Sequence, residues 1–125
     1  IEPYKERYAK VAIPIDDNKV SEHFGRAEKF LVFKVDREEG KIVEKREIKN
    51  PYKEKKMRAG LSCAKFLISE GIDVLITKEI GEIAFHMLGD EGVEIYMAME
   101  SIDECIDKFI KEKLKQLKKP TKVKE

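Results

Sequence analysis

The hydrophobic periodicity of this chain changes at Asn50-Pro51, and the change limits the folds that the chain can adopt. Before this point, apolar residues form short runs typical of β-strands. After it, segments with helical spacing alternate with short apolar runs. The predicted strands cover residues 10–15, 29–36, 41–49, 72–77 and 93–99. The predicted helices cover residues 57–68, 81–88 and 102–117. The expected order is βββαβαβα, which indicates an α/β fold.

The connections between these elements predict one mixed sheet. The first three strands form an antiparallel meander, with Gly40 in the turn between the second and the third. Right-handed helical crossovers then place the last two strands parallel to the first. The result is a five-stranded mixed sheet with strand order 3-2-1-4-5. The carboxyl ends of strands 1, 3, 4 and 5 meet at one edge, where open α/β sheets bind ligands near the switch in strand order.

The loop after the first strand carries the most distinctive residues, Ser21-Glu22-His23-Phe24-Gly25-Arg26-Ala27. A histidine on a loop can face outward and coordinate a metal, and Gly25 lets the backbone turn and approach a ligand. The predicted strand order places this loop at the carboxyl edge of the sheet. The other interpretation of His23 is a hydrogen bond across its own loop.

The remaining cysteines, histidine and methionines are weaker candidates. Cys63 lies in the first turns of the predicted helix 57–68, where the helix dipole favours a thiolate, so it is either a soft metal ligand or a small packed residue. Cys105 falls on the apolar stripe of the last helix and is expected in the core. His86 is expected at the surface. Three methionines could add thioether contacts or fill packing gaps: Met57, Met97 and Met99.

Charge and hydropathy exclude several classes of protein. Charged residues make up 41% of the chain but leave a net charge of only +1, so nothing in the balance indicates nucleic acid or an anionic membrane. No apolar run reaches the roughly 20 residues of a membrane span, and residues 1–10 contain no signal-peptide core. We therefore expect a cytoplasmic protein with reduced thiols. Few Asn and Gln beside abundant Lys and Glu suggest a thermophilic source.

The end of the chain is strongly basic. Residues 111–125 hold seven Lys against Glu112 and Glu125. We expect a single domain over residues 1–114, followed by a frayed Lys-rich tail over residues 115–125. In a different interpretation, this tail makes the chain a protein-partner binding module.

Several motifs, taken in order, resemble a known family. They are Lys10-Val-Ala-Ile-Pro-Ile15, Ser21-x-His23-Phe24-Gly25-Arg26-Ala27-x-x-Phe30, Asn50-Pro51, Ile80-Gly81 with Ala84-Phe85 and Leu88, and Gly92-Val93-Glu94-Ile95-Tyr96. Over about residues 9–114 the chain is similar to the nitrogenase iron–molybdenum cofactor biosynthesis domain family, which includes the carriers NifX and NafY and the C-terminal domain of NifB. It departs from that pattern at residues 52–58, which lack the His- and Gly-rich stretch of many members, and at Glu82, where a proline is common.

The resemblance implies a ribonuclease-H-like fold and a non-enzymatic carrier or store for an iron–sulfur cluster or an iron–molybdenum cofactor precursor. The family's histidine, implicated in cofactor binding, corresponds to His23. Arg26 and the backbone donors after Gly25 could balance an anionic cluster, and Cys63 could be a second metal ligand. These ligands are too few for a full [4Fe–4S] cage, so a second protomer, exogenous thiols or loose ligation would be needed. A cluster donor or acceptor protein is the expected partner, and a homo-oligomer is possible.

The ribonuclease-H-like fold also suggests a different function, a hydrolase acting on nucleic acid. Two-metal nucleases of that architecture hold divalent ions with carboxylates on central strands. The predicted strand 10–15 offers none, and Asp16 and Asp17 lie past its end. The sequence therefore favours the carrier over the hydrolase.

Overall fold

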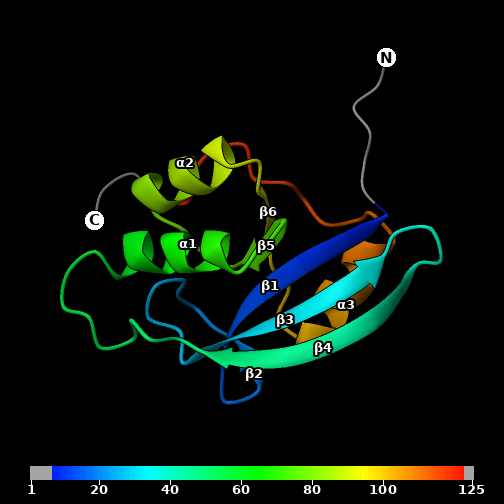
Figure 1. The fold of residues 1–125 in the computed structure, drawn as a ribbon, viewed down its shortest axis with the longest axis horizontal. Helices are drawn as coiled ribbons and strands as arrows, with labels where there is room; N and C mark the ends of the chain where they lie inside the picture. The colour runs from blue at the N-terminus through cyan, green and yellow to red at the C-terminus, as the bar shows by residue number, and fades with distance from the viewer. Residues whose placement is uncertain (1–6, 123–125) are drawn as a thin grey trace.

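One mixed sheet with helices on both faces forms the protein (Figure 1). The computed structural model describes residues 7–122. Its strands are β1 (Tyr8–Asp16), β2 (Lys19–Val20), β3 (Lys29–Asp36), β4 (Lys41–Lys49), β5 (Val74–Thr77) and β6 (Glu94–Met97). Its helices are α1 (Ala59–Ser69), α2 (Glu82–Asp90) and α3 (Ile102–Ile110). Among the described residues, no helix is both long enough and apolar enough to span a bilayer. The predicted mixed α/β class is confirmed.

The strands follow the path β4-β3-β1-β5-β6, and β2 pairs with β1 beside this path. The pairs β1–β3 and β3–β4 are antiparallel, whereas β1–β5 and β5–β6 are parallel. The sheet has six strands instead of the predicted five because Asp17 (φ 50°) and Asn18 (φ 64°) turn the chain back into β2. Two consecutive positive φ values are typical of the tightest hairpin turns. The ribonuclease-H-like classification stays a prediction.

The sheet separates two hydrophobic cores. α1 and α2 cover one face, where Ala12 of β1 packs with Leu67 of α1, and α3 covers the other face, where Val11 of β1 packs with Phe109. Successive strand residues point to opposite faces, so a strand with helices on both sides is apolar throughout. Cys105 of α3 is fully buried in the second core, as predicted.

β4 forms one edge of the sheet. It pairs only with β3 along the described sheet, and nearly all its side chains are exposed. Lysine, arginine and glutamate side chains alternate along it and hinder pairing with another strand. The prediction of an edge strand over residues 41–49 is therefore confirmed.

The last helix is shorter than predicted. α3 ends at Ile110 instead of continuing to Leu117, and Glu112 adopts a left-handed conformation (φ 58°). Leu114 and Leu117 then pack against the two cores on opposite faces of the sheet. Side chains three residues apart reach opposite faces in an extended chain, whereas in a helix they share one face. The apolar spacing that suggested a longer helix comes from an extended segment.

The predicted frayed tail differs from the structure over residues 115–122. The N–H of Met97 in β6 donates to the carbonyl of Lys115 (2.9 Å), and the N–H of Leu117 donates to the carbonyl of Ile95 (2.7 Å). Backbone groups of an edge strand need hydrogen-bond partners, and this segment supplies them to β6. Residues 123–125 of the predicted tail, and residues 1–6 of the predicted domain, lie outside the described residues.

Candidate functional site

A groove of about 650 Å³ lies at the edge of the sheet where β1 and β5 end. α1 and α2 begin at this edge, on the left in Figure 1. The loop containing His23 forms one side of the groove, and the first turns of α1 and α2 form the others. Its volume falls within the roughly 300–1,000 Å³ of typical ligand sites.

His23 reaches the groove because Phe24, the next residue, is anchored in the core. Phe24 is 3% exposed and packs against Phe30, with ring centroids 6.1 Å apart. The backbone N–H of His23 donates to Ser21 Oγ (3.0 Å), and this hydroxyl donates to Asp16 Oδ2 (2.7 Å). The backbone of the loop is thus fixed, while the His23 side chain stays 60% exposed.

The His23 ring bonds to a neighbouring loop and not across its own. Its Nδ1 lies 2.9 Å from Oε1 of Glu79, which is in the turn between β5 and α2. Lys122 Nζ lies 3.2 Å from the same oxygen. Burial would raise the pKa of Glu79, but the hydrogen bonds from His23 and Lys122 outweigh it and hold this pKa below its ordinary 4.5. Glu79 therefore accepts both bonds as a carboxylate.

Gly25 and Arg26 hold the loops around the groove in place. The Arg26 N–H groups donate to the protein's own backbone carbonyls. A Cβ at Gly25 would lie 2.6 Å from the backbone nitrogen of Gly60, so only glycine lets the loop touch the start of α1. Arg26 donates to the backbone carbonyls of Lys55 and Lys56, the latter at 3.1 Å. Arg26 thereby fixes the loop before α1 and leaves its positive charge at the groove.

Cys63 lies beneath the His23 loop and outside the groove lining. It is fully buried, and its Sγ donates to Asn50 Oδ1 (3.3 Å) and to the carbonyl of Gly25 (3.5 Å). Burial raises the pKa of the Cys63 thiol to about 11, although the hydrogen bond with Asn50 and the charge of Arg26 act against it. Burial therefore opposes the thiolate that the start of α1 would favour, which agrees with the interpretation of Cys63 as a small packed residue. The role of Cys63 as a metal ligand stays a prediction. Its buried position outside the groove lining does not favour that role.

Asn50 joins the loops on both sides of the groove. It is 7% exposed, and its Nδ2 donates to the carbonyls of Gly25 (3.1 Å) and Ala27 (2.8 Å). Its Oδ1 accepts from the backbone N–H of Tyr52 (2.9 Å). One buried amide thus holds the His23 loop against the loop that leads to α1.

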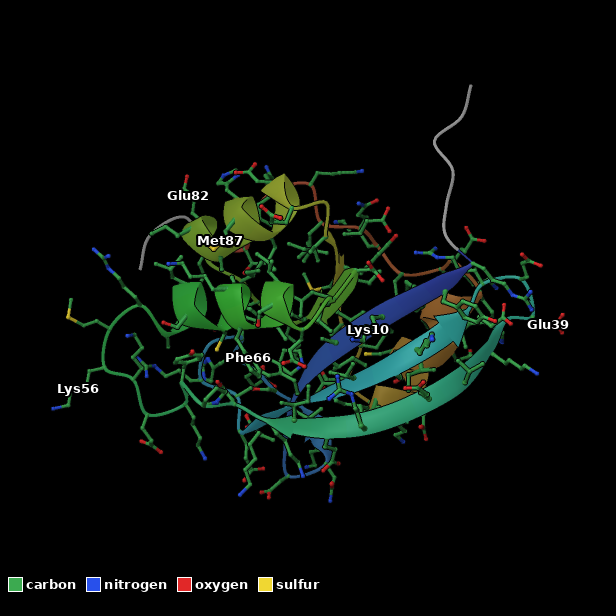
Figure 2. All side chains as sticks on the ribbon, viewed as in Figure 1. Lys10, Glu39, Lys56, Phe66, Glu82 and Met87 are labelled. Atoms are coloured by element: carbon green, nitrogen blue, oxygen red, sulfur yellow. The ribbon has the colours of Figure 1, made fainter. Side chains whose placement is uncertain are left out.

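The groove carries an excess of positive charge. Four cationic side chains line it, Arg26, Lys56, Arg58 and Lys122, beside one carboxylate, Glu79. Figure 2 shows Lys56 on the loop that precedes α1. α1 and α2 both begin in the groove, and neither has a side-chain cap, so their first N–H groups add positive potential. This arrangement favours an anionic ligand.

The other candidate residues contribute less. Met57 and Ile83 are 73% and 53% exposed at the groove. His86 is exposed on α2, as predicted. Within residues 7–122, no three His, Cys, Asp or Glu side chains converge to hold a metal ion. For a metal cluster, residues 7–122 therefore provide one exposed imidazole in the groove, that of His23, and no complete set of ligands.

Sequence reasoning missed Asn50, Glu79, Arg58 and Lys122 as site residues. A signal existed for Glu79, because it follows the predicted strand 72–77, which the predicted strand order placed beside strand 10–15. No comparable signal existed for Lys122, because it fell in the predicted tail.

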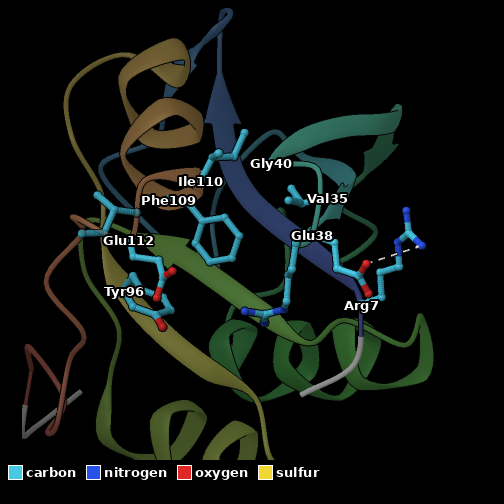
Figure 3. A pocket seen from close by; sticks show the side chains of 10 residues that line it. Arg7, Val35, Glu38, Gly40, Tyr96, Phe109, Ile110 and Glu112 are labelled. Atoms are coloured by element: carbon cyan, nitrogen blue, oxygen red, sulfur yellow. Dashed lines mark ion pairs between the residues drawn. The ribbon is translucent and has the colours of Figure 1, made fainter. Parts of the chain in front are cut away.

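A second cavity, of about 380 Å³, lies near the turn between β3 and β4 (Figure 3). The rings of Tyr96 and Phe109 meet there edge to face at 5.8 Å, and the Arg37 guanidinium lies 5.9 Å from the centre of the Phe109 ring. None of the predicted site residues lines this cavity. We therefore place the candidate site at the His23 groove.

Comparisons with known proteins agree with the resemblance seen in the sequence. Residues 7–112 match the model of the family described as dinitrogenase iron-molybdenum cofactor. An uncharacterized protein of Methanocaldococcus jannaschii is 35% identical over 113 residues, which are 90% of this chain and 94% of that protein.

Two solved structures have similar folds. A Thermotoga protein proposed to be a NifB protein is 31% identical, with a TM-score of 0.69 over 91% of this chain and 97% of its own. The apo form of the orange protein from Desulfovibrio gigas has a TM-score of 0.76 over 90% of this chain and 96% of its own, and its 23% identity supports the fold alone. The family match covers most of the chain. This protein therefore belongs to the dinitrogenase iron–molybdenum cofactor family.

Proposed function

We propose that this protein carries or stores an anionic iron–sulfur cluster or iron–molybdenum cofactor precursor in the His23 groove, without catalysing a reaction. The observation that supports this most is the exposed His23 in a groove lined by four cationic side chains and the starts of two helices. Membership of the family supports the class of cargo. A cluster donor or acceptor protein is then the expected partner.

The residues of the groove fit such a cargo. Neutral imidazole is a good ligand for iron, and inorganic clusters with sulfide and thiolate ligands are commonly anionic. Because iron–sulfur clusters normally take four protein ligands, one histidine alone cannot enclose one. The remaining ligands would come from the cargo or from a second protomer. Incomplete and exposed ligation suits a protein that must release what it carries.

Anaerobic reconstitution tests this function. The purified protein is mixed with ferrous and ferric iron, sulfide and a small thiol, and charge-transfer absorption is measured after removal of unbound iron. We expect absorption in the wild type, a large loss in His23→Ala, and no loss in His86→Ala, which removes an exposed histidine outside the groove. Cys63→Ala should keep most of the absorption because the thiol lies beneath the loop. No absorption in the wild type would contradict the proposal.

The positive charge of the groove can be tested separately. We expect Lys56→Gln combined with Arg58→Gln to weaken cluster retention several-fold, and salt to weaken it in the wild type, because both reduce attraction to an anion. The matched control is Lys41→Gln combined with Lys45→Gln, two exposed changes on β4 outside the groove. Equal retention by the groove variant and the control would show that charge does not hold the cargo.

A further inference from the structure

The contact between His23 and Glu79 determines which imidazole nitrogen is available to a ligand. Glu79 Oε1 lies 2.9 Å from Nδ1. A carboxylate can only accept hydrogen bonds, so Nδ1 must carry the proton when the imidazole is neutral. No described residue forms a hydrogen bond with His23 Nε2, so its lone pair faces solvent and is available to a ligand.

We propose that Glu79 is a positioning residue that holds His23 in the tautomer protonated at Nδ1 and leaves Nε2 as the nitrogen that binds the cargo. This inference rests on the proposed function, in which His23 contacts the cargo. Metal-binding histidines commonly donate their other ring N–H to a carboxylate, which fixes the ring and makes the ligand nitrogen more basic. Glu79 is well placed for this task because its side chain is only 28% exposed.

Glu79 is itself held from two directions. Its backbone carbonyl accepts from Thr77 Oγ1 (3.0 Å) at the end of β5. From the other side, the N–H of the following residue, Ile80, donates to Thr121 Oγ1 (2.8 Å), and the N–H of Thr121 donates to the carbonyl of Ile80 (3.0 Å). Lys122 adds its ion pair with the carboxylate at 3.2 Å. The segment that follows α3 thus helps to position the histidine across the groove.

The tautomer can be read without any cargo. Long-range ¹H–¹⁵N correlation spectra of the cargo-free protein, recorded where imidazole is neutral, distinguish a proton on Nδ1 from one on Nε2. We expect the Nδ1–H form for His23 and, in Glu79→Ala, a change to the Nε2–H form that unconstrained imidazole prefers. Glu79→Gln should keep the Nδ1–H form because its amide oxygen still accepts. The exposed His86 is the internal reference. A wild-type His23 in the Nε2–H form, or no change in Glu79→Ala, would overturn the proposal.

Cluster binding provides the second measurement. Loss of a carboxylate behind a metal-binding histidine typically costs about 10- to 100-fold in affinity. We expect a loss of this size in Glu79→Ala, partial recovery in Glu79→Gln, and no change in Glu100→Gln, whose 88% exposed carboxylate pairs with Lys78. Unchanged affinity in Glu79→Ala while His23→Ala loses binding would overturn the positioning role alone. Failure of the wild type to bind a cluster would overturn the proposed function and leave the tautomer result standing.

Discussion

Removing the Asn50 side chain should destabilise the whole site, because its amide joins both loops of the groove. Asn50→Ala removes three hydrogen bonds with N–H donors, to the carbonyls of Gly25 and Ala27 and from the N–H of Tyr52, together with the weaker bond from the Cys63 thiol. A typical intramolecular hydrogen bond contributes about 1 kcal/mol net, so we expect the free energy of unfolding to fall by about 3 kcal/mol. With about 2.1 cal/mol/K of unfolding entropy per residue, this loss lowers Tm by roughly 11 °C for 125 residues.

Urea unfolding of the cargo-free protein, followed by circular dichroism, measures this change. Asn50→Asp is the matched variant, because it keeps the size and the acceptor oxygen but loses the donors to Gly25 and Ala27. At pH 7 its carboxylate would face those two carbonyls, so we expect a loss at least as large as in Asn50→Ala. A loss below about 0.5 kcal/mol in Asn50→Ala, as for an ordinary surface substitution, would refute this reasoning.

Three further predictions follow from individual contacts. Gly25→Ala should lower the free energy of unfolding by about 1–3 kcal/mol in the same assay, because its Cβ would lie 2.6 Å from the Gly60 nitrogen. Hydrogen bonding to Arg7 holds the pKa of Asp36 at about 2, below its ordinary 3.8. The unfolded chain therefore takes up this proton at higher pH than the folded protein, so the stabilisation is complete above about pH 4 and is lost as pH falls toward 2. Asp36→Asn should weaken the acid dependence of stability in that range, and an unchanged dependence would contradict the pairing. Burial raises the pKa of the Cys63 thiol to about 11, so iodoacetamide at pH 8 should leave it unmodified in the folded protein and alkylate it in urea, as measured by mass spectrometry. Rapid alkylation of the folded protein would show that the thiol is accessible.

Periodicity predicted the long strands because helices cover both faces of the central sheet. Residues 29–36 read as apolar on both faces, and β3 covers the same range with six of its eight residues buried. The edge position of β4 was also visible, since its charges alternate with few apolar residues. Such patterns reflect which side chains are buried, and the order of apolar and polar residues along the sequence indicates this directly.

The end of α3 could not be predicted in the same way. Leu114 and Leu117 have helical spacing relative to Phe109 and Ile110, but each packs against a different face of the sheet. A spacing of three residues fits both a helix and an extended segment that crosses a sheet edge. The extended conformation forms because this segment pairs with the edge of β6, and that pairing is a tertiary contact that the spacing does not contain.

The position of the His23 loop could be predicted from the sequence, whereas the role of its residues in binding a cargo stays a prediction. The strand order placed His23 at the edge where β1 and β5 end, and the structure has the groove there. For Cys63 the sequence left two interpretations open, a soft metal ligand and a small packed residue, and its burial and raised thiol pKa agree with the second. Glu79 and Lys122 meet only through tertiary contacts, which no local pattern contains.

Anaerobic native mass spectrometry tests the central claim most directly, because it reports the cargo and the number of protein chains together. The wild type and His23→Ala are each incubated with ferrous and ferric iron, sulfide and a small thiol and then freed of unbound iron. We predict mass increments of an iron–sulfur cluster on the wild type, on one chain or a pair, and their absence or strong reduction in His23→Ala. A wild type without any such increment, or equal increments in both proteins, would contradict the assignment of the His23 groove as the cargo site.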